Sequence, residues 1–169
     1  MLGRRAFAVL AALMGSAGVA HAFVPPPLAK KSVHEDPMVT VAPASGQIPA
    51  PSTVAAAPLD AEVSASGLRS KVLRAGTGAR ATDKDACVVH YTGWTTDGKM
   101  FDSSVVRKMP ATFHPNAVIK GFAEGMLLMR VGEQRRLWIP GALGYGDAPK
   151  PGRPTGLLVF DIELVALQK

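Results

Sequence analysis

The sequence predicts an α+β fold in which an antiparallel β-sheet wraps around a single α-helix. Three observations in the second half of the 169-residue chain lead to this class. Several short segments are rich in β-branched and aromatic residues, which favour strands. One segment repeats apolar residues at spacings of three and four, as an amphipathic helix does. An Asp-Gly pair follows one strand-like segment and predicts a tight hairpin turn.

The first two strands are expected early in this region. Residues 68–73 form the first, which Gly76-Thr77-Gly78 closes. Residues 87–94 form the second, and strand alternation places Cys87, Val89 and Tyr91 on one face. Asp97-Gly98 follows directly and turns the chain back as a hairpin.

The helix is expected over residues 118–130. Its apolar positions form one stripe that turns toward the sheet: Ile119, Phe122, Met126 and Met129. Gly132 marks its end. Two more strands, residues 137–139 and 157–167, complete the sheet. In the last strand, the even-numbered apolar residues face one way and Asp161 and Glu163 face the other.

Residues 1–22 have the pattern of a secretory signal peptide. Arg4 and Arg5 precede an apolar run, and Ala20-His21-Ala22 has the small residues of a cleavage site. A membrane anchor would need roughly 20 consecutive apolar residues, and this run is interrupted from Gly15 onward. We therefore expect an exported protein of the bacterial periplasm with no membrane anchor after cleavage. The paired arginines leave both the general and the twin-arginine export routes open.

Residues 23–61 are rich in proline and alanine. Because each proline lacks an N–H and clashes with the preceding turn, no helix propagates through this segment. We expect a disordered, extended spacer, with a proline-rich ligand for a partner domain as the alternative. The globular domain is then expected to cover residues 62–169.

Composition excludes some classes of partner. The formal net charge is +6, but basic and acidic residues are interspersed in the domain. Nucleic-acid binding would need a concentrated basic stripe and aromatic stacking platforms, so we expect none. The single cysteine, Cys87, cannot form an intramolecular disulfide and is expected to pack as a small hydrophobe.

The sequence argues against two other kinds of site. His90, Asp102 and Ser103 contain the residue types of a hydrolase triad, but no G-x-S-x-G elbow is present and His90 should face away from Tyr91. The four histidines lack the spacing of metal ligands. We therefore expect no metal and no cofactor.

Five segments in order resemble the blocks of the FKBP-type peptidyl-prolyl cis-trans isomerases. They are Cys87-Val88-Val89-His90-Tyr91-Thr92-Gly93, Asp97-Gly98-Lys99-Met100-Phe101-Asp102-Ser103-Ser104, Val118-Ile119-Lys120-Gly121-Phe122-Ala123-Glu124-Gly125, Gly144-Tyr145-Gly146 and Leu158-Val159-Phe160-Asp161-Ile162-Glu163-Leu164. The resemblance implies a sheet that half-wraps one short helix, with an apolar proline-binding cleft between them. It also implies that eight residues line this cleft: Tyr91, Phe101, Asp102, Val118, Ile119, Phe122, Tyr145 and Phe160.

The implied activity is isomerisation of peptide bonds that precede proline. In this interpretation Phe101, Phe122, Phe160 and Tyr91 grip the proline ring. The Ile119 N–H and the Tyr145 hydroxyl bind substrate carbonyls, and Asp102 either polarises the twisting group or orders Tyr91. Tyr91, Phe101, Asp102, Ile119 and Tyr145 are thus the catalytic candidates, and Val118, Phe122 and Phe160 bind substrate.

The sequence departs from the family pattern at three places. Phe122 stands where many members have tryptophan, Ala111 stands where some have another aromatic residue, and residues 147–154 lack the paired isoleucines of eukaryotic members. These departures bear on affinity for macrolide inhibitors more than on isomerisation. The leading hypothesis is a monomeric folding enzyme for proline-containing exported polypeptides. The alternative is a non-catalytic chaperone or binding module that uses the same cleft.

Overall fold

The computed structural model describes residues 46–149 and 151–169. The predicted signal peptide and the first part of the predicted spacer, up to residue 45, lie outside the described residues. The strands are β1 (Glu62–Val63), β2 (Arg69–Arg74), β3 (Ala86–Thr95), β4 (Met100–Ser103), β5 (Ala111–Phe113), β6 (Gln134–Ile139) and β7 (Leu158–Gln168). The helices are α1 (Lys120–Leu128) and the short 3-10 turns η1 (Pro115–Ala117) and η2 (Gly141–Leu143).

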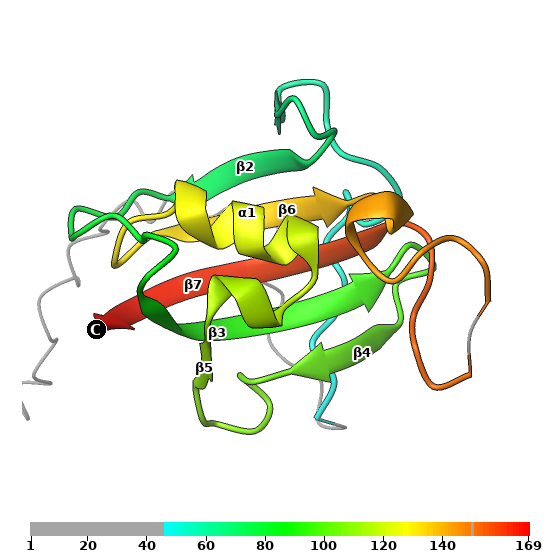
Figure 1. Cartoon of the computed structure of the whole chain (residues 1–169). Helices are drawn as coiled ribbons and strands as arrows, with labels where there is room; N and C mark the ends of the chain where they lie inside the picture. Colours follow the sequence, from blue (N-terminus) through cyan, green and yellow to red (C-terminus); the bar gives the residue numbers. More distant parts are fainter. Residues whose placement is uncertain (1–45, 150) are drawn as a thin grey trace, which may run out of the picture. The chain divides into compact units, whose positions relative to one another are not determined.

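One antiparallel sheet carries the fold, in the order β1-β2-β6-β7-β3-β4, with β5 paired to β3 (Figure 1). The long strands β3 and β7 form its centre, and their register runs from Ala86 opposite Gln168 to Thr95 opposite Leu158. The predicted hairpin joins β3 to β4, where Gly98 adopts a φ of 83° that its lack of a Cβ permits. The predicted α+β class is confirmed.

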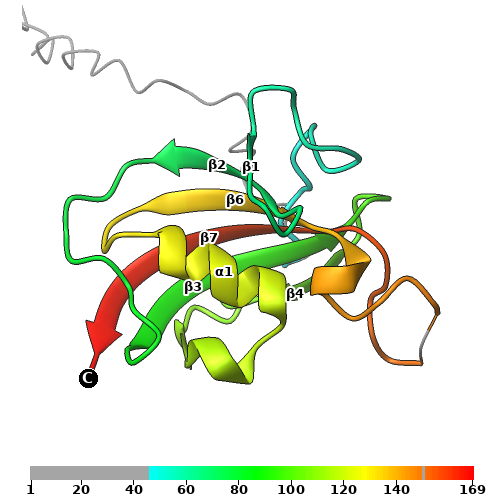
Figure 2. The same ribbon diagram turned by 45° about the horizontal axis from the view of Figure 1, so that its top comes forward.

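The helix α1 packs on one face of this curved sheet (Figure 2). Gly121 and Gly125 lie four residues apart on the helix face that meets β6. A Cβ on Gly125 would lie 2.2 Å from Leu137 Cδ1, and one on Gly121 would lie 2.4 Å from Ile139 Cγ2. These glycines therefore allow α1 to approach the sheet closely, and the fully buried Met126 fills the space beside them.

The helix is shorter at both ends than the predicted range of 118–130. Ile119 precedes its first turn in an extended conformation, and Met129 is extended after its last turn. At the C-terminal end, the carbonyl of Met129 accepts a backbone hydrogen bond of 3.1 Å from Ala81. This bond to the loop between β2 and β3 competes with helix continuation, so tertiary pairing overrides the apolar periodicity.

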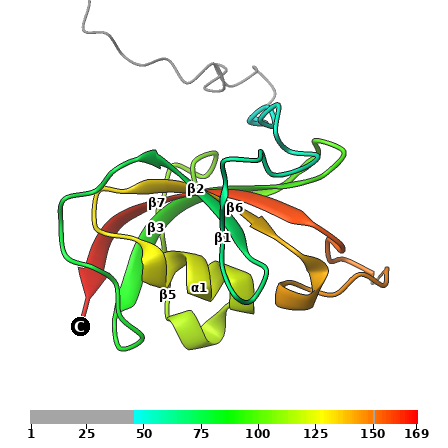
Figure 3. The same ribbon diagram turned by 90° about the horizontal axis from the view of Figure 1, so that it is seen from above.

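Residues 46–61 lie on the sheet face opposite α1 (Figure 3). The indole N–H of Trp94 donates to the carbonyl of Ile48 at 2.9 Å, and that of Trp138 donates to the carbonyl of Thr53 at 2.8 Å. Val54 packs near Trp138 in a small apolar cluster. The prediction of a disordered spacer is therefore wrong for residues 46–61. Short turns order part of this segment internally, and the two tryptophans hold it to the sheet through the carbonyls of Ile48 and Thr53.

No helix within residues 46–149 and 151–169 has the length and apolar character needed to cross a membrane.

Candidate active site

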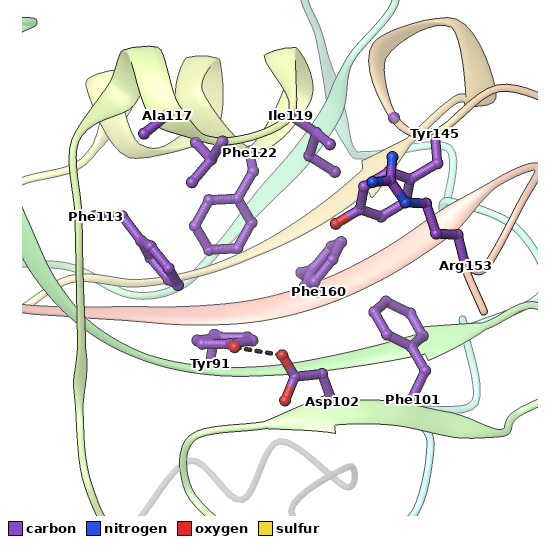
Figure 4. A pocket seen from close by; sticks show the side chains of 12 residues that line it. Tyr91, Phe101, Asp102, Phe113, Ala117, Ile119, Phe122, Tyr145, Arg153 and Phe160 are labelled. Carbon is purple, nitrogen blue, oxygen red and sulfur yellow. Dashed lines mark hydrogen bonds between the residues drawn. The ribbon is translucent and has the colours of Figure 1, made fainter.

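A pocket of about 610 Å³ opens between α1, the central strands and the loop after η2. All eight residues predicted to form the cleft line this pocket (Figure 4). They are Tyr91, Phe101, Asp102, Val118, Ile119, Phe122, Tyr145 and Phe160. The structure thus brings the predicted set together in one cavity, and the individual roles remain predictions.

Aromatic rings from four strands, the helix and the loop after η2 form the pocket walls. Phe160 is the centre of this group, with its ring centroid 5.2 Å from that of Phe122 and 5.4 Å from that of Phe101, both in edge-to-face contact. Tyr91 lies edge-to-face to Phe122 at 5.8 Å. Edge-to-face packing fixes ring orientation, so the apolar surface is shaped before any ligand enters.

Gly93 explains how Phe101 and Phe160 come so close together. It lies in β3 opposite both neighbouring strands, and a Cβ there would lie 2.7 Å from Phe101 Cζ and 2.7 Å from Phe160 Cε1. Any side chain at this position would separate the two rings. Gly93 therefore allows the two rings to pack together in the pocket wall.

The start of α1 supplies the opposite wall. Val118 and Ile119 are extended between η1 and α1, which turns both toward the pocket rather than along the helix. The first N–H groups of a helix have no intrahelical partner. The backbone N–H of Ile119, which caps α1, is therefore available to a ligand carbonyl.

Asp102 lies at the centre of a three-residue polar network. The hydroxyl of Tyr91 donates a short hydrogen bond to Asp102 Oδ2, and Arg107 Nη1 forms a short ion pair with Asp102 Oδ1. Arg107 Nη2 also donates to the Tyr91 hydroxyl at 3.0 Å. Both oxygens of the carboxylate are thus engaged, and the Tyr91 ring is fixed at the edge of the pocket.

The network shifts the pKa of each member. Burial opposes ionisation of Asp102, but hydrogen bonds from Tyr91 and Arg107 outweigh it and lower the pKa of the carboxyl. Burial and the bond to Asp102 raise the pKa of Tyr91. The bond to Asp102 raises the pKa of Arg107 further above its ordinary value. At neutral pH the pocket therefore holds a carboxylate paired to a guanidinium, and a neutral tyrosine.

Tyr145 and Arg153 complete the pocket from the loop after η2. The guanidinium carbon of Arg153 lies 5.7 Å from the centroid of the Tyr145 ring (Figure 4). Within the described parts of the chain, the Tyr145 hydroxyl has no hydrogen-bond partner. It is a second donor available to a ligand.

Sequence reasoning missed four residues that line the pocket: Phe113, Ala117, Gly144 and Arg153. It also missed Arg107, which does not line the pocket but pairs with Asp102. Phe113 stacks obliquely on Tyr91 at 5.7 Å and edge-to-face on Phe122 at 5.8 Å, whereas Ala111 borders the core without lining the pocket. The two residues share a strand face, since they are two apart, and this spacing could have identified Phe113. Arg107 and Arg153 lie in loops, where no periodic signal points to the site.

The rejected hydrolase triad does not assemble. His90 Nδ1 lies 3.2 Å from Ser104 Oγ, while the Ser103 hydroxyl lies 2.9 Å from that of Thr92. His90 does not line the pocket, so it faces away from the Tyr91 ring as predicted. Among the described residues, no three His, Cys, Asp or Glu side chains converge as metal ligands.

Comparison with known proteins gives consistent results. The profile of the family "FKBP-type peptidyl-prolyl cis-trans isomerase" matches residues 78–165, which is just over half of the chain. FkpA of Aeromonas hydrophila is 48% identical over 105 residues, covering 62% of this chain and 39% of that relative. The macrophage infectivity potentiator of Trypanosoma cruzi is 46% identical over 116 residues, covering 67% of this chain and 59% of that relative.

A solved structure shows the same arrangement. The crystal structure of FkpA from Escherichia coli matches with a TM-score of 0.62 and 39% sequence identity, covering 66% of this chain and 53% of that one. The chain thus covers less than two thirds of these relatives' length. The pocket, the fold and the extent of the profile match lead to one assignment: the chain belongs to the family of FKBP-type peptidyl-prolyl cis-trans isomerases.

Proposed function

We propose that this protein accelerates cis/trans isomerisation of peptide bonds that precede proline in other polypeptides. One observation carries the proposal. A preformed aromatic pocket contains all eight predicted residues, and two hydrogen-bond donors without partners among the described residues, the Ile119 N–H and the Tyr145 hydroxyl, lie at its edge.

The chemistry needs neither a nucleophile nor a metal, because no covalent bond is broken. The barrier of about 18–20 kcal/mol comes from amide resonance, which separates charge between oxygen and nitrogen. An apolar pocket disfavours the polar planar amide and accommodates the twisted one, so it lowers the barrier by stabilising the transition state relative to the ground state. The walls formed by Phe101, Phe122 and Phe160 suit this task.

The two donors are suited to different carbonyls. A hydroxyl rotates to follow its acceptor, so Tyr145 suits the carbonyl of the residue before proline, which swings as the amide twists. The Ile119 N–H is fixed by the backbone and suits the carbonyl of proline itself, which moves little. Together they hold the substrate at both ends of the proline ring.

Asp102 acts in this proposal as a positioning residue. Both its oxygens are engaged by Tyr91 and Arg107, which favours a role in ordering the Tyr91 wall over direct polarisation of the substrate. Because Tyr91 and Arg107 bind both carboxylate oxygens, no unpaired negative charge of Asp102 faces the apolar proline ring of the substrate.

The location and assembly of the protein are parts of the same proposal. The pattern of residues 1–22 supports export to a bacterial periplasm, where newly exported proline-containing polypeptides would be the clients. The proline-rich residues 23–61 cannot form a helical dimerisation arm, which supports a monomer. The aromatic pocket is also a candidate site for macrolides, with weak affinity expected because no isoleucines overhang it at residues 147–154.

A protease-coupled assay on short X–Pro peptides tests the activity. We expect the purified protein to accelerate isomerisation above the buffer rate. Phe101→Ala should lower kcat/KM about tenfold or more, since loss of about 1.4 kcal/mol of transition-state contact corresponds to one factor of ten. Val165→Ala is the control, because Val165 is 43% exposed on β7 and does not line the pocket. A rate equal to that of buffer would leave a binding module as the better description.

A further inference from the structure

Arg153 is a charged residue in the wall of an otherwise aromatic pocket. It is exposed, belongs to the loop that joins η2 to β7, and lines the cavity together with Tyr145 and Phe101. Its guanidinium lies over the Tyr145 ring, at 5.7 Å from the centroid. Figure 4 shows the side chain reaching over Tyr145 on the pocket side of the loop.

The positive charge of Arg153 is not neutralised by the described part of the chain. No Asp or Glu in residues 46–149 and 151–169 forms an ion pair with it. Arg107, which does not line the pocket, differs in this respect, because Asp102 accepts its hydrogen bond. Among the described residues that line the pocket, Arg153 is thus a cation without a carboxylate partner.

A cation–π contact with Tyr145 places this cation beside the ring. A guanidinium that packs on an aromatic face keeps its N–H groups free at the edge of its plane, where they can bind a carboxylate with two parallel hydrogen bonds. Arg153 therefore lines the pocket beside Tyr145 and has guanidinium N–H groups that no carboxylate of the described residues engages.

We propose that Arg153 is a specificity-determining residue that favours substrates with an acidic residue immediately before proline. This inference rests on the proposed isomerase function. In that mechanism the Tyr145 hydroxyl holds the carbonyl of the residue before proline, so the side chain of that residue lies beside Tyr145. A Glu there meets the Arg153 guanidinium, and a Lys there meets a like charge.

Matched peptides provide the test in the coupled assay with the full chain. Acetyl-Ala-Glu-Pro-Phe-nitroanilide and the Gln-Pro analogue differ only in charge at one position, and the acetyl group removes the N-terminal charge. We expect kcat/KM to be about two- to fivefold higher for Glu-Pro than for Gln-Pro, the range of an exposed ion pair. The ratio should approach 1 in about 1 M NaCl, where the Debye length falls to about 3 Å.

Substitutions then locate the effect. Arg153→Gln should bring the Glu/Gln ratio to about 1, and Arg153→Glu should invert it and favour a Lys-Pro peptide. Lys84→Gln is the control: Lys84 is exposed, precedes β3 at the end away from the hairpin and does not line the pocket. It removes the same charge and should leave the ratio unchanged.

The outcomes separate the inference from the function on which it rests. Acceleration of Gln-Pro turnover with no Glu preference would overturn the role of Arg153 and leave the isomerase function standing. A preference that survives Arg153→Gln, or that appears only with Glu after proline, would also overturn it. Absence of acceleration with every peptide would overturn the isomerase function itself.

Discussion

Gly93 lies in β3 under the two rings that form one wall of the pocket, and Gly93→Ala separates pocket geometry from overall stability. A Cβ at this position would lie 2.7 Å from Phe101 Cζ and 2.7 Å from Phe160 Cε1. Ordinary carbon contacts are about 3.5–4.0 Å, so at least one ring must retreat by about 1 Å. Phe160 is only 4% exposed and packs on Phe122. The ring of Phe101, which is only partly buried, is therefore the one that moves.

Two magnitudes follow from this displacement. Overpacking a protein interior costs about 1–3 kcal/mol, and we expect the lower half of this range because Phe101 can move into the open pocket. A domain of ordinary stability then stays more than about 99% folded at 25 °C. Misplacing a substrate-contacting group by about 1 Å can cost up to about a hundredfold in rate, so we expect kcat/KM to fall about ten- to hundredfold.

The assay combines urea denaturation with protease-coupled kinetics on the same samples. Gly67→Ala is the matched control. Gly67 lies in the turn before β2 with a φ of 91°, and a Cβ added to it would have no neighbour within 4 Å. Alanine there therefore costs about 1–2 kcal/mol of backbone strain without touching the pocket. Wild-type kinetics for Gly93→Ala, or equal losses of activity for both variants, would refute the reasoning.

Two further predictions concern stability. Trp138→Phe removes the indole N–H that donates to the carbonyl of Thr53, so unfolding in urea should become easier by about 1–3 kcal/mol; an unchanged midpoint would mean that residues 46–61 do not hold to the sheet. The pKa of Asp102 is lowered below its unfolded value of about 3.9, so its stabilising contribution is present above about pH 4 and is lost as pH falls through the folded pKa. The stability difference between wild type and Asp102→Asn should therefore be present at pH 7 and shrink below pH 4. Because the Asp102 side chain is 40% exposed, solvent screening limits this stability difference to about 1 kcal/mol. A stability difference that grows as the pH falls would contradict the predicted direction.

Much of the sheet could be predicted because its signals are local. The β-branched run before Trp94 and the Asp97-Gly98 pair fix a strand and its turn through short-range sterics. The ends of α1 could not be predicted in the same way. Met129 continues the apolar stripe, yet its carbonyl pairs with Ala81, a partner 48 positions away that no local pattern reveals.

In the candidate site, too, the residues on strands could be predicted from local signals and the residues in loops could not. Tyr91, Phe101 and Phe160 lie on strands, where alternation and the family resemblance together place them on the pocket face. Arg153 lines the pocket from a loop, and Arg107, also in a loop, contacts the pocket residues Asp102 and Tyr91. Their directions depend on their partners, Asp102 and Tyr145, which become neighbours only when the chain is folded.

By itself, the sequence determined the class of fold, the hairpin and the aromatic composition of the pocket, because these follow from backbone sterics, side-chain periodicity and ordered motifs. Only the tertiary structure decided three other features. These are the docking of residues 46–61 on the two tryptophans, the pairing of both Asp102 oxygens, and the place of Arg153 in the pocket with no carboxylate partner among the described residues. Each depends on hydrogen bonds or charges between segments distant in sequence, and such pairings are fixed by the packing of the whole domain.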